Sequence, residues 1–251
     1  MTALSIVIIT KNESQNIADC LKSVAFANEI LVLDSGSKDG TVAIATSMGA
    51  NVIETDWIGF GHQKNRGIDN AKGPWIFILD ADERVSIKLA NEIQDAIQNN
   101  QYDVFEVPRS SLFVSKFMRH SGWSPDYTKR LFKKGSAKFS THNVHEHLET
   151  SHHHGRLKEP LIHYSYRDFE TVLNKMNHYS TAGALDAFNA GKKSSLRKAI
   201  GHGLWAFIRT YFIRAGFLDG REGLMLSIAN AEVTYYRYIK LSHLNATKND
   251  Y

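Results

Sequence analysis

"WIFILDADERVS", residues 75–86, runs five apolar residues directly into three carboxylates, Asp80, Asp82 and Glu83. The apolar run is typical of a strand that is covered on both faces, and the acids mark its carboxyl end. Three negative charges at one place repel one another and by themselves lower the stability of the fold. We therefore expect positive charge among them.

Strands and helices alternate along the first hundred residues. Continuous apolar runs predict buried strands over residues 4–10, 30–34, 51–54 and 75–79. Apolar residues at helical spacing predict four helices between or after them: one capped by Ser14, one from Thr41 to Met48, one from His62 to Lys72 and one capped by Ser86. This alternation predicts an α/β sheet with right-handed crossovers.

The pattern changes further along the chain. Strands are expected over residues 102–107 and 127–135, and the sequence from Asp168 onward is helical and aromatic. We expect one domain over residues 1–167 and a helical extension over residues 168–251. No uncharged stretch reaches the roughly 18 residues of a membrane-spanning helix, and the first residues indicate a strand and not a signal peptide.

Polar side chains follow three of the predicted strands. The first strand ends in residues 10–13, the second in residues 34–41 and the fourth in residues 80–83. Ligands of open α/β sheets bind at this edge. Asp80 and Asp82 project to the same side of an extended chain, and carboxylate oxygens suit Mg²⁺ or Mn²⁺. The alternative is that both acids only solvate a strand end and begin a turn.

Four motifs resemble those of family 2 glycosyltransferases: TKNE (10–13), LDSGSKDGT (33–41), HQKNRGIDNAKG (62–73) and LDADE (79–83). The resemblance covers roughly residues 4–100 and implies a GT-A fold, a Rossmann-like mixed sheet flanked by helices. GWSPDYTKRLFKKG (122–135) and NVHEHL (143–148) resemble the branch that contains lipopolysaccharide core β-1,4-glucosyltransferases. That branch implies inverting transfer of a hexose, with glucose from UDP-glucose as the best guess, to an inner-core heptose in a β linkage.

The resemblance also implies roles for individual residues. The UDP-sugar donor would be bound by Thr10, Asn12, Glu13, Asp34, Lys64, Arg66 and Asp80. Asp34 would accept a hydrogen bond from the uracil N3–H, and Lys64 and Arg66 would lie near the uracil or the phosphates. Asp80 would contact the ribose or a metal-bound water. Asp82, with Asp80, would form the site of a divalent cation, Mg²⁺ or Mn²⁺, that bridges the diphosphate.

An inverting transfer also needs a general base near the acceptor hydroxyl. Asp126, which follows Pro125 in GWSPD, is the first choice, although it is equally typical of an ordinary turn. Glu146 is the reserve. His145 or His147 could complete the metal shell, but a neutral histidine in an ordinary hydrogen bond is the more common arrangement.

The charge distribution points to an anionic partner. Of the 30 Lys and Arg residues, 22 lie beyond residue 100. Residues 196–218 combine aromatic side chains with basic ones, a pattern that favours a membrane interface; packing on the sheet domain or on another copy is the alternative. With Cys20 as the single cysteine, we expect a cytoplasmic protein, peripheral on the inner face of the plasma membrane, that acts on a lipid-linked saccharide acceptor.

Two other functions stay open at this point. A polyprenyl-phosphate sugar synthase would share the basic character but would transfer to a phosphate, which needs no strong base. A basic nucleic-acid-binding protein is the alternative from another class. We expect no nucleic-acid partner, because the sequence contains no recognition motif and the acids at the strand ends would repel a phosphate backbone.

Overall fold

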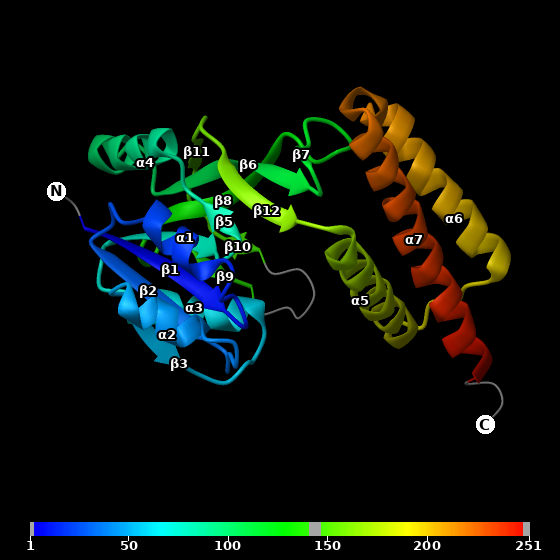
Figure 1. The fold of residues 1–251 in the computed structure, drawn as a ribbon, viewed down its shortest axis with the longest axis horizontal. Helices are drawn as coiled ribbons and strands as arrows, with labels where there is room; N and C mark the ends of the chain where they lie inside the picture. The colour runs from blue at the N-terminus through cyan, green and yellow to red at the C-terminus, as the bar shows by residue number, and fades with distance from the viewer. Residues whose placement is uncertain (1–2, 141–146, 248–251) are drawn as a thin grey trace. The chain divides into compact units, whose positions relative to one another are not determined.

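The computed structural model describes residues 3–140 and 147–247 (Figure 1). Four parallel strands form one side of its main sheet, in the order β3–β2–β1–β4: β1 (Leu4–Thr10), β2 (Glu29–Asp34), β3 (Asn51–Glu54) and β4 (Trp75–Asp80). The four predicted strands are confirmed. Thr10 pairs with Asp34, and Ile9 pairs with Asp80. The polar ends of three strands therefore meet at one edge of the sheet, as predicted.

Four helices accompany these strands: α1 (Ile17–Ser23), α2 (Thr41–Ser47), α3 (Phe60–Asn70) and α4 (Ile87–Asn99). The hydroxyl of Ser86 accepts from the backbone N–H of Leu89 at 3.1 Å, so this predicted cap is confirmed. The Ser14 cap is wrong. Asn16 precedes α1, and the backbone N–H of Ser14 donates to Asp39 at 3.0 Å. The loop after β1 is thus held by the loop after β2, and the helix begins later.

The sheet continues past β4 with strands from the second half of the chain, in the order β4–β8–β6–β12–β5. These strands are β5 (Glu83–Arg84), β6 (Val104–Phe113), β8 (Asp126–Lys133) and β12 (Leu161–Tyr166). β8 is antiparallel to β4, and β5 is antiparallel to β12. Parallel and antiparallel pairs share one sheet, so the predicted mixed sheet is confirmed.

Short strands complete this part of the chain. β7 (Lys116–Phe117) and β11 (His154–Arg156) both pair with β6. A separate two-stranded sheet joins β9 (Lys138–Phe139) to β10 (Leu148–Glu149).

Buried apolar clusters cover both faces of the parallel strands. On one face, residues of α1, α2 and α4 pack against Ile6 and Phe77. On the other face, Ile68 of α3 and Phe139 of β9 pack with Val7. Because strand side chains alternate between faces, the continuous apolar runs in the sequence correspond to strands covered on both sides.

The chain forms two compact units, residues 1–109 with 127–163, and residues 110–126 with 164–251. In the second, α7 (Arg221–Thr247) packs along α5 (Phe169–Asn189) and α6 (Leu196–Ile208). A π-helical turn (Arg209–Ile213) and a 3₁₀ turn (Gly216–Asp219) link α6 to α7. No helix among the described residues is long and apolar enough to cross a membrane. The domain boundary at residue 167 stays a prediction.

Gly67 lets α3 approach the sheet closely, and it lies three residues from Lys64. A Cβ there would meet Leu33 Cδ1 at 2.9 Å and Val7 more closely still. We expect Gly67→Ala to lower the free energy of unfolding by about 1–3 kcal/mol, as overpacking does. Urea unfolding followed by circular dichroism measures the change. Gly201→Ala on α6 is the control. A Cβ there has no atom within 4 Å, and the change should be neutral or stabilising. Equal midpoints for Gly67→Ala and the wild type would contradict the close approach.

Candidate active site

Asp80, the last residue of β4, lies between two basic side chains. Arg130 of β8 donates from Nη2 to Asp80 Oδ2 at 2.9 Å, and Lys64 of α3 places Nζ 3.5 Å from Oδ1. Burial opposes ionisation of Asp80, but the charges of Arg130 and Lys64 outweigh it and hold the pKa of Asp80 well below its usual range. The positive charge expected among the acids is thus supplied here by the chain's own side chains.

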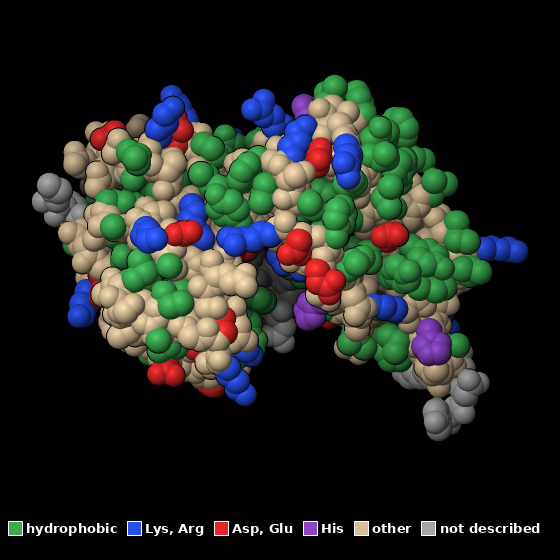
Figure 2. Space-filling model, in the orientation of Figure 1, with side chains coloured by type: hydrophobic (Ala, Val, Ile, Leu, Met, Phe, Trp, Pro, Cys, Tyr) green, Lys and Arg blue, Asp and Glu red, His purple; other side chains and the backbone are tan. Residues whose placement is uncertain are grey.

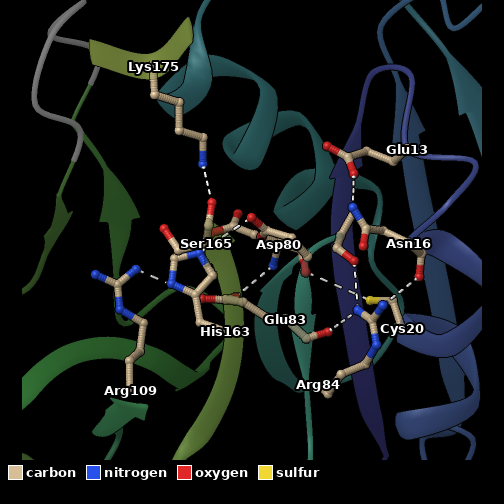
Figure 3. A network of polar contacts seen from close by, with 12 residues as sticks. Glu13, Asn16, Cys20, Asp80, Glu83, Arg84, Arg109, His163, Ser165 and Lys175 are labelled. Atoms are coloured by element: carbon tan, nitrogen blue, oxygen red, sulfur yellow. Dashed lines mark hydrogen bonds and ion pairs between the residues drawn. The ribbon is translucent and has the colours of Figure 1, made fainter. Parts of the chain in front are cut away.

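Glu83 is the second acidic partner of Arg130. Its side chain is fully buried, and Oε1 accepts from Arg130 Nη2 at 2.7 Å (Figure 3 shows Glu83 beside Asp80). Oε2 accepts the backbone N–H of Asp80 at 2.9 Å, and Arg109 Nη1 lies 3.9 Å from Oε1. Burial raises the pKa of Glu83, and the charge of Arg130 compensates for only part of this rise. One guanidinium therefore bridges two acids of the same motif.

Arg84 fixes the loop that follows β4. Its buried guanidinium donates from Nη1 to the carbonyl oxygens of Ala81 at 2.8 Å and Glu83 at 2.7 Å, and from Nη2 to that of Asn16 at 2.9 Å (Figure 3). The loop is thereby tied to the start of α1. Its acids are held in place before any ligand binds.

Asp82 has a different neighbour. His163 of β12 places Nε2 3.4 Å from Asp82 Oδ2, and both side chains stay partly exposed, 15% and 24% respectively. The pairing of β12 with β5 sets this contact, because His163 lies opposite Glu83 in the ladder. The two aspartates of the motif therefore differ in their contacts. Asp80 contacts cations of the chain, whereas Asp82 faces an imidazole.

Asp82 and His163 fit a divalent cation. A carboxylate oxygen and an imidazole nitrogen are donors that Mn²⁺ accepts. Both Asp80 oxygens lie against cationic side chains, and the expected metal role of Asp80 stays a prediction. Among residues 3–140 and 147–247, no cluster of three or more His, Cys, Asp or Glu side chains could hold a metal ion. The ion would thus need ligands from outside the protein, such as diphosphate oxygens and water.

Asp34 organises the loop after β2. Its Oδ1 accepts from the backbone N–H groups of Gly36 at 3.0 Å and Ser37 at 2.7 Å, and Oδ2 accepts from the Thr10 hydroxyl at 2.9 Å. Thr10 and Asp34 are both buried. In the structure these two predicted binding residues shape the site edge, and the predicted contact of Asp34 with uracil stays a prediction.

Asn12 and Glu13 join the loops after β1 and β2. The backbone N–H of Asn12 donates to Ser37 Oγ at 2.7 Å, and its side-chain oxygen accepts from the N–H of Lys38 at 2.9 Å. The N–H of Glu13 donates to Thr41 Oγ1 at 2.8 Å. The predicted nucleoside-lining residues are thus brought together at the polar edge of the sheet.

Lys64 and Arg66 share α3 but contact different loops. Lys64 is almost fully buried beside Asp80, whereas Arg66 donates from Nη1 to Asp56 Oδ1 at 2.6 Å. The structure therefore brings Lys64 to the acids and holds Arg66 at the end of β3.

A pocket of about 430 Å³ opens beside Asp80. It is lined by Lys64, Asp80, Glu106, Arg109, Tyr127, Thr128, Lys129, Arg130, Phe139, His147 and Leu148. Four of these side chains are basic and two are acidic, so the lining favours a ligand with negative charge.

Of the predicted bases and histidines, the structure describes Asp126 and His147. Asp126 is the first residue of β8 and belongs to the second compact unit. Glu146 and His145 lie outside the described residues. His147 lines the pocket, and its Nε2 lies 3.5 Å from Glu149 Oε1. The choice of base and the role of His147 therefore stay predictions.

Sequence reasoning missed Arg130, His163 and Arg109. Arg130 stands within residues 127–135, which the sequence predicts as a strand and which belong to a motif of the resemblance, but neither gives Arg130 a role. Its signal is a basic residue directly before the apolar pair Leu131 and Phe132. His163 interrupts an apolar run in LIHYSY (161–166). A charge inside a buried strand indicates a buried partner, but it does not name that partner.

Comparisons with known proteins identify the family of this chain. The family described as Glycosyl transferase family 2 matches residues 5–165, and the chain belongs to this family. An uncharacterized glycosyltransferase of Rickettsia bellii is 32% identical over 262 residues, which cover 98% of this chain and 88% of the relative. The lipopolysaccharide core biosynthesis glycosyltransferase LpsC of Rhizobium meliloti is 26% identical over 255 residues, which cover 94% of this chain and 93% of the relative.

A solved structure, S. aureus TarS 1–349, has the same overall fold, with a TM-score of 0.50 at 14% identity, covering 98% of this chain and 92% of that one. The predicted resemblance and the GT-A fold are thus confirmed, and glycosyl transfer is the class of activity.

We expect Arg130→Met to lower the free energy of unfolding by roughly 3–5 kcal/mol, because Glu83 would be left buried without its counter-ion. Urea unfolding measures the effect. The control is Arg156→Met, which removes an ion pair to Glu106 in which the arginine side chain is 64% exposed; it should cost below about 1 kcal/mol. Similar losses for the two variants would show that Arg130 is not the main counter-ion of these acids.

Proposed function

We propose that this family member is an inverting, metal-dependent hexosyltransferase that uses a UDP-sugar. The proposed sugar is glucose, and the proposed acceptor is an inner-core heptose of lipopolysaccharide. The observation that carries the proposal is the meeting of the ordered loops after β1 and β2 with Asp80 and Asp82 at one sheet edge. The lipopolysaccharide core role in the name of the Rhizobium relative supports the choice of acceptor.

Negative charge develops on the diphosphate as the bond between sugar and phosphate breaks. A divalent cation held by Asp82 and His163 would supply positive charge to this leaving group. Lys64 and Arg109 line the pocket beside Asp80 and add positive charge to it. Arg130 and Lys64 hold Asp80 ionised and in place, so the acid can orient the donor.

Inversion requires the acceptor hydroxyl to attack from the face opposite the diphosphate. An α-linked donor then gives a β-linked product. We propose that Asp126 accepts the proton of that hydroxyl, with Glu146 as the reserve. A positioned base of this kind contributes about 10²–10⁴-fold in rate.

The proposed acceptor is lipid-linked, which would place the enzyme in the cytoplasm, peripheral on the inner face of the plasma membrane. The basic character of the second half of the chain supports this location.

Asp82→Ala should abolish both glycosyl transfer and Mn²⁺-dependent binding of UDP, because it removes the carboxylate that faces His163. Isothermal titration calorimetry with UDP, with and without Mn²⁺, measures the binding. Asp95→Ala, at an exposed aspartate of α4, is the control and should behave as the wild type. Wild-type turnover by Asp82→Ala would refute the metal role. DNA binding by filter assay, in the absence of UDP binding, would favour the nucleic-acid alternative.

Asp126→Asn should keep UDP-sugar binding and lose turnover by roughly 10²-fold or more, because the amide cannot accept the proton. Initial rates with a panel of UDP-sugars give the turnover, and calorimetry gives donor affinity. Glu146→Gln is the matched variant. Full activity of Asp126→Asn together with loss in Glu146→Gln would transfer the role to Glu146.

A further inference from the structure

Helix α6 turns small residues toward its neighbour. Ala199, Gly203 and Ala206 are its buried positions. A Cβ at Gly203 would meet Tyr235 Cβ at 3.2 Å and the carbonyl oxygen of Ala231 at 3.3 Å, so α6 and α7 approach each other closely. The contact of α6 with α7 is therefore made by small residues.

The large apolar residues of α6 lie on the outside. Ile200, Leu204 and Trp205 are 54%, 60% and 53% exposed, and Ile213 and Leu218 in the turns that follow are exposed as well. In Figure 2, hydrophobic side chains gather over the part of the molecule in which Figure 1 places α6. A surface helix of a soluble protein normally turns its polar side outward. An apolar outer surface of this kind indicates a binding partner.

We define the α6 face as the exposed apolar residues of α6 and its two following turns. They are Leu196, Ile200, Leu204, Trp205, Phe212, Ile213, Phe217 and Leu218. Contiguous apolar surface that a monomer leaves exposed marks an interaction site.

The same segment is strongly basic. Residues 192–221 contain seven Lys or Arg residues and a single acid, Asp219. Asp219 is buried and accepts from the backbone N–H groups of Arg119 at 3.1 Å and His120 at 2.9 Å. The only negative side chain of the segment is thus turned inward, and its exposed charge is positive.

A basic pocket lies beside the amino-terminal end of α6. It has a volume of about 340 Å³ and is lined by Ala187, Lys192, Lys193, Lys198, His202, Arg237, Tyr238 and Leu241. Four of these side chains are Lys or Arg and none is acidic. Such a lining suits a phosphate group, as basic pockets between helices do for lipid headgroups.

These features together select one partner. The 13 residues of α6 span about 20 Å, too short for the roughly 30 Å of a bilayer core, so the helix can lie in the interface but cannot cross it. A second copy of this chain would oppose like charges, and nucleic acid would offer no apolar surface to Leu204 or Ile213. We propose that the α6 face docks on a membrane of anionic phospholipid, with a headgroup phosphate in the basic pocket.

This inference does not rest on the transfer chemistry, and its test needs no sugar substrate. The full-length protein is mixed with vesicles of phosphatidylcholine alone or with about 30% phosphatidylglycerol, and flotation is measured at low and high salt. We expect flotation with the anionic vesicles, loss of it at high salt, and little with the neutral ones. No flotation at low salt, or equal flotation with both vesicles, would overturn the proposal.

Two variants with matched controls separate the α6 face and the basic pocket from general effects. Leu204→Glu should bind anionic vesicles at least ~10-fold more weakly, whereas Ile87→Glu, at an exposed position of α4, should bind as the wild type. Lys193→Glu with Lys198→Glu should weaken binding by ~30-fold or more. Lys72→Glu with Lys158→Glu, exposed lysines of the first unit, changes the net charge equally and should have a small effect.

Thermal melting by circular dichroism confirms that each variant folds. Vesicle binding that is unchanged in Leu204→Glu, or in Lys193→Glu with Lys198→Glu, would overturn the proposal. So would a wild-type dimer in sedimentation that Leu204→Glu dissociates while no form binds vesicles, because the α6 face would then be an interface between copies.

Discussion

The guanidinium of Arg130 neutralises two acids that lie 47 and 50 residues away in the sequence. The pairing of β8 with β4 sets this contact, with Phe132 opposite Ile76 and Leu131 opposite Phe77. A slip of one residue would turn Arg130 to the other face of the sheet and leave Glu83 buried without a counter-ion. The site therefore forms only when β8 pairs with β4 in this register.

The three acids of the motif have different sets of partners. Asp80 is held ionised by side chains of the protein, and Glu83 closes the loop through the backbone N–H of Asp80. Asp82 stays partly exposed opposite His163, where it can bind a ligand from solution. The three carboxylates of the motif thus differ in their contacts: Asp80 lies against Arg130 and Lys64, Glu83 is buried against Arg130, and Asp82 faces His163.

The second unit reverses the usual arrangement of a surface helix. Small residues of α6 make the close contact with α7, and bulky residues such as Trp205 remain outside. Burying the large side chains against α7 would have gained more apolar area, since stabilisation scales with the area removed from water. A lipid surface that contacts these residues would account for the arrangement, and it would bring the enzyme to the proposed lipid-linked acceptor.

The sequence by itself determined the four parallel strands β1 to β4, the Ser86 cap and the polar edge, because apolar runs, local hydrogen bonds and strand ends are properties of neighbouring residues. Its motifs also determined the family. The Ser14 cap is wrong because Asp39, 25 residues away, holds that loop. Only the tertiary structure brought Arg130 to Asp80 and His163 to Asp82, since the partner of a buried charge is chosen by strand pairing across long stretches of chain, and no local pattern encodes it.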